Sequence, residues 1–245
     1  MSKTSRRRFI RASTAISLSA MAYTNVAQAA ARGQQPIVGF IGCGGRSKNL
    51  RRTFDDAARI SWACDPDENR AKDLQKDTGA KHTTSDLRRV LDDNSVDAIV
   101  VATPDHWHAP AAIMGCDAGK HVYVEKPCSH NFYEGRLLVE AARRNNVVVQ
   151  HGTQSRSNPL IVGAIGLLRE GAIGDVLMAK AWNVQRRANI GHAKPSSPPS
   201  GVDYDIWVGP AEFVSFQANR FHYRWHWWYN FGTGDFGNDG AHEID

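Results

Sequence analysis

The sequence is poor in cysteine and has no cysteine pair with metal-binding spacing. Four cysteines are scattered along 245 residues without a C-x-x-C motif: Cys43, Cys64, Cys116 and Cys128. This scatter argues against both a zinc site and a disulfide framework. Most of them fall in or beside expected strands and helices, where a free cysteine packs as a small hydrophobic residue. We therefore expect no metal site.

Long apolar runs, internal repeats and low-complexity tracts are also absent. A spanning helix needs about 20 apolar residues, and the weakly apolar run at 12–22 is far shorter. It follows "TSRRRFIRAS", with Arg6 and Arg7, and precedes small-residue cleavage sites near Ala29. This order resembles a twin-arginine export signal over residues 1–30, with a disordered basic N-terminus as the alternative. The resemblance implies the twin-arginine export machinery as a partner, a periplasmic or otherwise exported location, and no membrane span after signal removal.

The net charge of +5 comes from the N-terminal segment. Five positive charges precede Ala29 and no acidic residue does: Lys3, Arg6, Arg7, Arg8 and Arg11. The remainder of the chain is therefore close to neutral. Because nucleic-acid binding needs a basic surface, we expect no nucleic-acid partner.

From Pro36 onward, apolar runs alternate with helix-like segments. The runs "PIVGFIG", "RISWACD", "VDAIVVATP", "HVYVEKP" and "VVVQHG" are typical of buried parallel strands. Helices are expected between them, at 46–58, 68–78, 86–92, 109–118 and 129–145. Strands separated by helices of this length predict an α/β fold with a doubly wound parallel sheet.

After Gln154 the pattern changes. A helix is expected at 159–169, and "VLMAKAWNVQ" (176–185) alternates like a half-exposed antiparallel strand. A Pro/Ser-rich loop, "HAKPSSPPSG", follows, and the rest is aromatic and rich in glycine. The aromatic run "FHYRWHWWYNF" (221–231) suits a sugar-stacking wall, a sheet core or a subunit interface equally well. A zinc pair from His222 and His226 is disfavoured in so aromatic a segment.

The turn after the first strand carries a dinucleotide fingerprint. In "GFIGCGGRS", Gly42 permits the tight turn, Gly44 lets the backbone approach a pyrophosphate, and Ser47 fills the small third position. Gly45 and Arg46, at the start of the following helix, are expected to join this site. Asp65 ends the next strand 23 residues after Gly42, where a carboxylate holds a ribose 2′-hydroxyl and favours NAD over NADP. The alternative is a Gly-rich turn with an Asp that caps a helix.

Two more motifs lie at the carboxyl ends of later strands, the edge where open α/β sheets bind ligands. In "TPDHWHA", we expect four side chains to face the nicotinamide half of the cofactor: Thr103, Pro104, His106 and His108. A metal pair from the two histidines is disfavoured because no third ligand is nearby. In "HVYVEKP", burial of Glu125 and Lys126 would cost several kcal/mol unless the site uses them. A salt-bridged Lys at a strand end is the alternative.

Four segments together resemble the Gfo/Idh/MocA oxidoreductases, particularly their exported members: "GFIGCGGRS", "ATPDHWHA", "GKHVYVEKP" and "VVQHGTQSRSNP". The resemblance runs from Ile37 to the last residue and is most specific over the first half. It implies an NAD-binding Rossmann domain at 36–155. It also implies an incomplete α+β domain at 156–245, in which an open antiparallel sheet carries the substrate and joins copies into a homo-oligomer.

The resemblance also implies catalytic roles. Lys126 would lie beside the nicotinamide and the reacting hydroxyl, with Glu125 positioning the site. The family's D-x-x-x-H motif aligns its catalytic His with His242 in "GNDGAHEID", but Asn238 stands where the Asp is usual and Asp239 is one residue out of register. Asn can bind a sugar hydroxyl but cannot accept a proton, so His242 and Lys126 would share the proton transfer. The alternative is a His and a capping residue at a helix start.

Asp239, Gln154 and Arg156 are expected on the substrate side. The sequence thus predicts an exported, NAD-dependent oxidoreductase of a sugar or polyol hydroxyl. Two alternatives remain: a redox-neutral glycosidase or lyase on the same scaffold, and a truncated, non-catalytic protein that binds nucleotide or sugar. Because "GAHEID" reads as the first turn of a helix, we expect a truncated product or a fragment of a longer gene.

Overall fold

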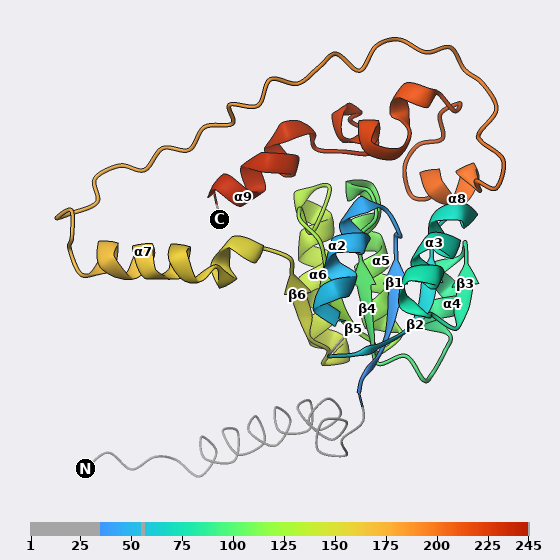
Figure 1. Ribbon diagram of the computed structural model, residues 1–245, viewed down its shortest axis with the longest axis horizontal. Helices are drawn as coiled ribbons and strands as arrows, with labels where there is room; N and C mark the ends of the chain where they lie inside the picture. Colours follow the sequence, from blue (N-terminus) through green and yellow to red (C-terminus); the bar gives the residue numbers. More distant parts are fainter. Residues whose placement is uncertain (1–34, 55–56, 245) are drawn as a thin grey trace.

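The computed structural model describes residues 35–54 and 57–244, so the predicted export signal at 1–30 lies outside the described residues. Strands and helices alternate along the first half (Figure 1). In chain order these elements are β1 (Ile37–Ile41), α2 (Gly45–Phe54), β2 (Arg59–Cys64), α3 (Glu68–Thr78), β3 (His82–Thr84), α4 (Leu87–Leu91), β4 (Ala98–Val101), α5 (Asp105–Asp117), β5 (His121–Val124), α6 (Phe132–Asn145) and β6 (Val149–His151).

The six strands form one parallel sheet in the order β3-β2-β1-β4-β5-β6. β1 lies in the middle, the chain moves outward to β3, and it then crosses back to β4 on the other side of β1. The loops after β1 and β4 therefore separate and leave a crevice, which is where doubly wound sheets bind ligands. The predicted doubly wound parallel sheet is confirmed.

Two apolar layers hold the helices against the sheet. Val38 and Phe40 point to the face covered by α2 and α3, where they meet Leu50 and Leu74. Ile99 and Val101 point to the other face, which α4, α5 and α6 cover. Successive residues of a strand alternate between faces, so a strand covered on both sides must be apolar throughout. This explains why the strands read as continuous apolar runs.

The second half of the chain is less regular. Its elements are a 3₁₀ turn η1 (Gln154–Ser157), α7 (Pro159–Arg169), α8 (Tyr204–Val208), the 3₁₀ turns η2 (Ala218–Arg220) and η3 (His222–Trp227), a π-helical turn η4 (Phe236–Gly240) and α9 (Ala241–Ile244). None of the described helices is both long and apolar enough to cross a membrane.

The strand predicted at 176–185 is not formed. Residues 176–199 have neither helix nor strand, and Leu177 is 94% exposed. A strand exists only when a neighbour pairs with its backbone, and no described residue offers this segment a ladder. For the same reason, the open antiparallel sheet expected for residues 156–245 is not observed among the described residues.

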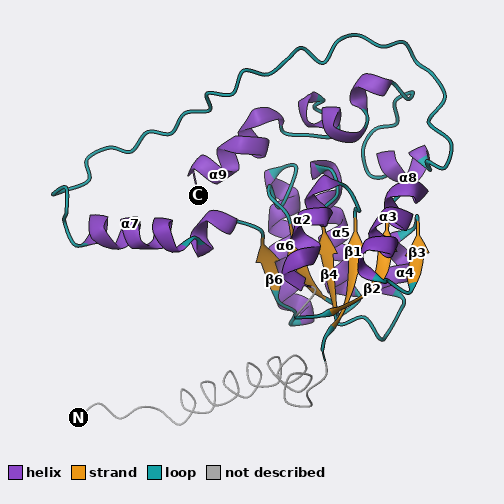
Figure 2. Ribbon diagram, in the orientation of Figure 1, coloured by secondary structure: helices purple, strands orange, loops and turns teal. Residues whose placement is uncertain are grey.

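An aromatic cluster anchors the last part of the chain to the Rossmann half. Its buried members are Tyr204, Trp207, Val208, Phe216, Phe221 and Phe231. The indole N–H of Trp107, on α5, donates to the backbone carbonyls of Ile206 and Trp207, each at 3.1 Å. The cluster and the segment that follows it consequently lie beyond the carboxyl ends of the strands, the side to which the arrowheads in Figure 2 point.

Candidate functional site

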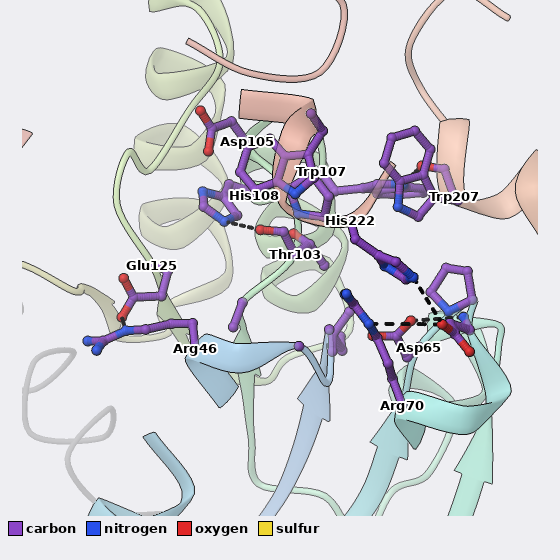
Figure 3. A pocket seen from close by; sticks show the side chains of 18 of the residues that line it. Arg46, Asp65, Arg70, Thr103, Asp105, Trp107, His108, Glu125, Trp207 and His222 are labelled. Carbon is purple, nitrogen blue, oxygen red and sulfur yellow. Dashed lines mark hydrogen bonds and ion pairs between the residues drawn. The ribbon is translucent and has the colours of Figure 1, made fainter. Parts of the chain in front are cut away.

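A cavity of about 560 Å³ lies at the carboxyl edge of the sheet, between the Rossmann loops and the C-terminal segment. The loops after β1, β2, β4 and β5 form one wall. Residues between 206 and 238 form the opposite wall. Figure 3 shows charged side chains at its two ends, with Arg46 and Glu125 at one end and Asp65 and Arg70 at the other. A cleft of this size at a topological switch point is the expected position of a dinucleotide site.

The fingerprint loop has the geometry that its glycines predict. Gly42 has a φ of +86°, and a Cβ there would lie 2.6 Å from the carbonyl oxygen of Ala102 and 2.8 Å from the amide nitrogen of Thr103. The buried Ser47 donates its hydroxyl to the carbonyl of Gly42, so a larger side chain would not fit. A Cβ at Gly45 would meet no atom within 4 Å, which leaves open space at the start of α2.

Asp65 connects the fingerprint loop to the end of β2. Its carboxylate accepts the N–H of Cys43 at 2.7 Å and the N–H of Asp67 at 2.8 Å. The residue is 6% exposed, and burial raises the pKa of its carboxyl group above the usual value. Each carboxylate oxygen retains a second lone pair, so the side chain can still accept a hydroxyl from the cavity.

Three further residues at this end of the cavity were not predicted from the sequence. Asp67 has its Oδ2 at 3.5 Å from the Nε2 of His222 and at 3.9 Å from the Nε of Arg70. Burial and the charge of Arg70 lower the pKa of His222 to about 4. His222 comes from a segment far along the chain, so no local pattern could have placed it beside β2.

The residues of the "TPDHWHA" motif after β4 have two different roles. Thr103, Pro104 and His108 line the cavity. The ring nitrogens of His108 lie 2.8 Å from the carbonyl oxygen of Thr103 and 2.6 Å from that of Pro127, so His108 links the loops after β4 and β5.

His106 does not face the cavity, contrary to the prediction. It is 3% exposed and lies between the carbonyl oxygens of Trp207, at 3.1 Å, and Phe231, at 3.3 Å. Burial lowers its pKa to about 4. Residues two apart on a helix point to different sides, so His106 and His108 cannot both face one ligand. The described residues contain no cluster suited to a metal ion.

Glu125 is buried because three donors surround it. It is 3% exposed, and its Oε1 accepts from Arg46 Nε at 2.8 Å, from Gln154 Nε2 at 2.8 Å and from the Tyr123 hydroxyl at 3.2 Å. Gln154, predicted to line the substrate side, therefore holds Glu125 instead. Arg156, on η1, is exposed and lies off the cavity wall.

Lys126 and Asn238 meet across the cavity. The Nζ of Lys126 donates to the backbone carbonyl of Asn238 at 2.5 Å and lies 3.5 Å from its side-chain oxygen. Burial lowers the pKa of Lys126, while the carboxylates of Asp105 and Glu125 act in the opposite sense. The D-x-x-x-H-like segment thus lies beside the E-K-P lysine, as the resemblance implied.

The other two residues of that segment are placed differently. Asp239 forms an ion pair with Arg187 and accepts from Asn183 at 3.3 Å, so it does not face the cavity as a free substrate ligand. His242, on α9, is exposed and lies off the cavity wall. Partial burial and the charge of Lys126 lower its pKa.

Comparison with known proteins identifies the two halves of the chain. The family profile described as the oxidoreductase family with an NAD-binding Rossmann fold matches residues 37–153, and the profile of the same family's C-terminal alpha/beta domain matches residues 179–245. Among solved structures, the WlbA dehydrogenase from Bordetella pertussis in complex with NADH and UDP-GlcNAcA superposes with a TM-score of 0.54. It is 29% identical over 58% of this chain and 44% of its own.

Proteins similar to this chain in sequence carry different names, and the alignments cover different fractions of their length. Inositol 2-dehydrogenase 2 of Saccharopolyspora erythraea is 34% identical over 74% of this chain and 56% of its own length. Levoglucosan dehydrogenase of Pseudarthrobacter phenanthrenivorans is 34% identical over 50% of this chain and 30% of its own length. A glycosyl hydrolase family 109 protein of Shewanella pealeana is 29% identical over 59% of this chain and 34% of its own length. The chain spans about half or less of the length of these relatives.

The two family profiles, the six-stranded sheet and the fingerprint loop all point to the same family. The first half of the chain is an NAD-binding Rossmann domain, and the chain belongs to the Gfo/Idh/MocA oxidoreductase family.

Proposed function

We propose that the protein is an NAD-dependent oxidoreductase that acts on a hydroxyl-bearing carbon of a sugar or polyol. The observation that carries this proposal is the position of Lys126. Its ammonium group shares one cavity with the fingerprint loop and with Asn238, where a hydroxylated substrate would meet the cofactor. Relatives named as inositol and levoglucosan dehydrogenases support the substrate class.

The residues present fit a dinucleotide. The open space in front of Gly45 gives a pyrophosphate access to the first N–H groups of α2, a ten-residue helix whose dipole favours an anion there. At the other end, the neighbouring carboxylates of Asp65 and Asp67 would repel a 2′-phosphate, whereas a 2′-hydroxyl can donate to either. Arg70 offers one compensating charge, and it already lies 3.9 Å from Asp67. This favours NAD over NADP.

When bound, the nicotinamide would supply the acceptor for the hydrogen that leaves the substrate carbon. The chain's own part is to hold the substrate oxygen and to move its proton. Lys126 would donate a hydrogen bond to that oxygen, and its lowered pKa brings its proton exchange closer to neutral pH. The buried Glu125, fixed by Arg46 and Gln154, holds the loop that carries Lys126.

A second candidate is a redox-neutral glycosidase or lyase on the same scaffold. The similarity to a protein named for glycosyl hydrolase family 109 favours it. Such an enzyme would oxidise and later re-reduce the same sugar carbon. It would release product without net formation of NADH, whereas a dehydrogenase would form one NADH for each substrate oxidised.

We also propose export by the twin-arginine pathway, supported by Arg6, Arg7 and the apolar run that follows them. A fusion of residues 1–30 to a reporter that functions only after folded export would test this. Export by the natural sequence that persists when both arginines are changed to lysine would contradict a twin-arginine route.

The proposed function is tested first by the bound nucleotide. The protein is purified, denatured, and the released nucleotide identified by chromatography and mass. We expect NAD near one equivalent per chain in the wild type, in Lys126→Gln and in the control Lys76→Gln, an exposed lysine on α3. A panel of sugars and polyols is then screened for NADH formation. We expect Lys126→Gln to lower turnover at least 100-fold and Lys76→Gln to leave it unchanged. Folded wild type that carries no NAD, or undiminished turnover in Lys126→Gln, would refute the proposal.

A further inference from the structure

The C-terminal segment touches the Rossmann half at the adenosine end of the cavity. Asp65 marks this end, because a carboxylate at the end of the second strand is the usual partner of the adenosine ribose. The loop that follows it, residues 66–68, lies against residues 201–203. Three backbone contacts join them: the N–H of Asp203 donates to the carbonyl of Pro66 at 2.9 Å, the N–H of Glu68 donates to the carbonyl of Gly201 at 3.0 Å, and Asp67 forms an antiparallel bridge with Val202.

The approach of these two segments is close. Gly201 has a φ of +80°, and a Cβ there would lie 2.5 Å from the Oε1 and 2.7 Å from the Cγ of Glu68. Directly after it, Asp203 accepts the N–H of Ile206 at 3.0 Å and begins α8, which supplies Ile206 and Trp207 to the cavity wall. The contact with the loop after β2 therefore fixes where this wall begins.

His222 reaches the same loop from η3. Its Nε2 lies 3.5 Å from the Oδ2 of Asp67, whose own N–H donates to Asp65 at 2.8 Å. His222 lines the cavity, and Figure 3 shows its side chain directed toward the end that carries Asp65 and Arg70. The ring is thus only one residue removed from the carboxylate that would hold the ribose.

The backbone of His222 adopts a conformation that residues with side chains avoid. Its φ is +52°, which costs about 1–2 kcal/mol. Asn146 also has a positive φ, but it ends α6, where a left-handed residue is common. His222 ends no helix, and its ring packs on Phe221 with centroids 3.9 Å apart. Unfavourable backbone conformations of this kind cluster at ligand sites, and here the conformation places a ring on the cavity wall.

We propose that His222 is a cofactor-binding residue and that, together with residues 201–203, it closes the adenosine end of the site over NAD. The inference rests on the NAD site of the proposed function and is independent of the substrate. NAD would be held between the two halves of the chain, so His222 should act mainly on the rate of its release. Because the ring lies at the adenosine end, it should act equally on a ligand that lacks the nicotinamide.

A chase experiment tests the effect on release. The protein is loaded with NADH, excess NAD⁺ is added, and the fall of NADH fluorescence excited through the tryptophans gives the release rate. Glycine suits the backbone at φ +52°, so His222→Gly should remain folded, and His222→Asn also tolerates this conformation. We expect both variants to release NADH about tenfold faster or more. The control His192→Gly, at an exposed position, should stay within twofold of the wild type.

A second measurement locates the effect along the cofactor. ADP-ribose, which contains the adenosine end but no nicotinamide, is titrated as a competitor of NADH. We expect His222→Gly to weaken ADP-ribose and NAD by the same factor. Release within twofold of the wild type in both folded variants would overturn the inference alone, as would a loss of NAD affinity with unchanged ADP-ribose affinity. A folded wild type that binds neither NAD nor NADH would overturn the proposed function as well.

Discussion

Replacement of Gly42 by alanine should destabilise the whole Rossmann half. A residue with a side chain at φ +86° costs about 1–2 kcal/mol in backbone conformation alone. The added methyl would also lie 2.6 Å from a carbonyl oxygen and 2.8 Å from an amide nitrogen of the loop after β4, where contacts below 3 Å are not tolerated. Neither contact can be relieved by a side-chain rotation, because both partners are backbone atoms. We therefore expect a loss of about 3 kcal/mol in the free energy of unfolding.

For a chain of this length, a loss of that size lowers Tm by about 6–12 °C. Thermal unfolding followed by circular dichroism measures it, and Gly45→Ala is the matched control. A Cβ at Gly45 meets nothing within 4 Å, and its place at the start of α2 suits alanine, so its Tm should be unchanged or slightly raised. A Gly42→Ala variant whose Tm stays within 2 °C of the wild type would refute the steric argument.

Three further predictions concern the contacts between the two halves and the choice of cofactor. Thr233→Val removes the hydroxyl that donates to the buried carboxylate of Asp105 at 2.6 Å, and urea unfolding should show a loss of about 1.5–3 kcal/mol; a change below 0.5 kcal/mol would contradict it. Because burial holds the pKa of His106 at about 4, below its unfolded value of about 6.5, the stability present above pH 6.5 should fall by about 3 kcal/mol as the pH drops to 4. His106→Gln should remove that part of the pH dependence of the urea midpoint, and an unchanged profile would argue against it. Asp65→Asn should raise the affinity for NADP relative to NAD at least tenfold in a fluorescence titration, since it removes a charge that repels the 2′-phosphate; an unchanged ratio would mean that Asp65 does not face the ribose.

The sheet could be predicted from the sequence because its signal is local. Each buried strand is a continuous apolar run, and each is followed by a helix with a recognisable start. Within the Rossmann half, the errors lie at helix ends and at the short edge strand β3, which was not among the five expected strands. α5 begins at Asp105 rather than at Ala109, because the helix accommodates Pro110 instead of starting beside it. α6 begins after Asn131, whose side chain accepts the N–H of Glu134, rather than after Ser129.

The cofactor half of the site was predictable for the same reason. The fingerprint loop, Asp65 and the E-K-P motif are each fixed by a strand end and its adjoining turn. The opposite wall was not predictable, because it depends on contacts between residues about 100 or more positions apart. Asn238 reaches Lys126, and His222 reaches Asp67, only through the tertiary arrangement of an irregular segment. The aromatic character of this segment is visible in the sequence, but the residues that each ring contacts could not be predicted from it.

The "DHWH" motif, predicted as part of the nicotinamide site, serves mainly to join the two walls. Three consecutive side chains in the first turn of α5 bind the C-terminal segment. Asp105 accepts the N–H and hydroxyl of Thr233, His106 lies between the carbonyls of Trp207 and Phe231, and Trp107 donates to the carbonyls of Ile206 and Trp207. His108, which follows them, ties together the loops after β4 and β5. A single helical turn therefore fixes both sides of the cavity, so a substitution there should disturb the placement of Lys126 and Asn238 together even though none of these four side chains need touch the reacting carbon.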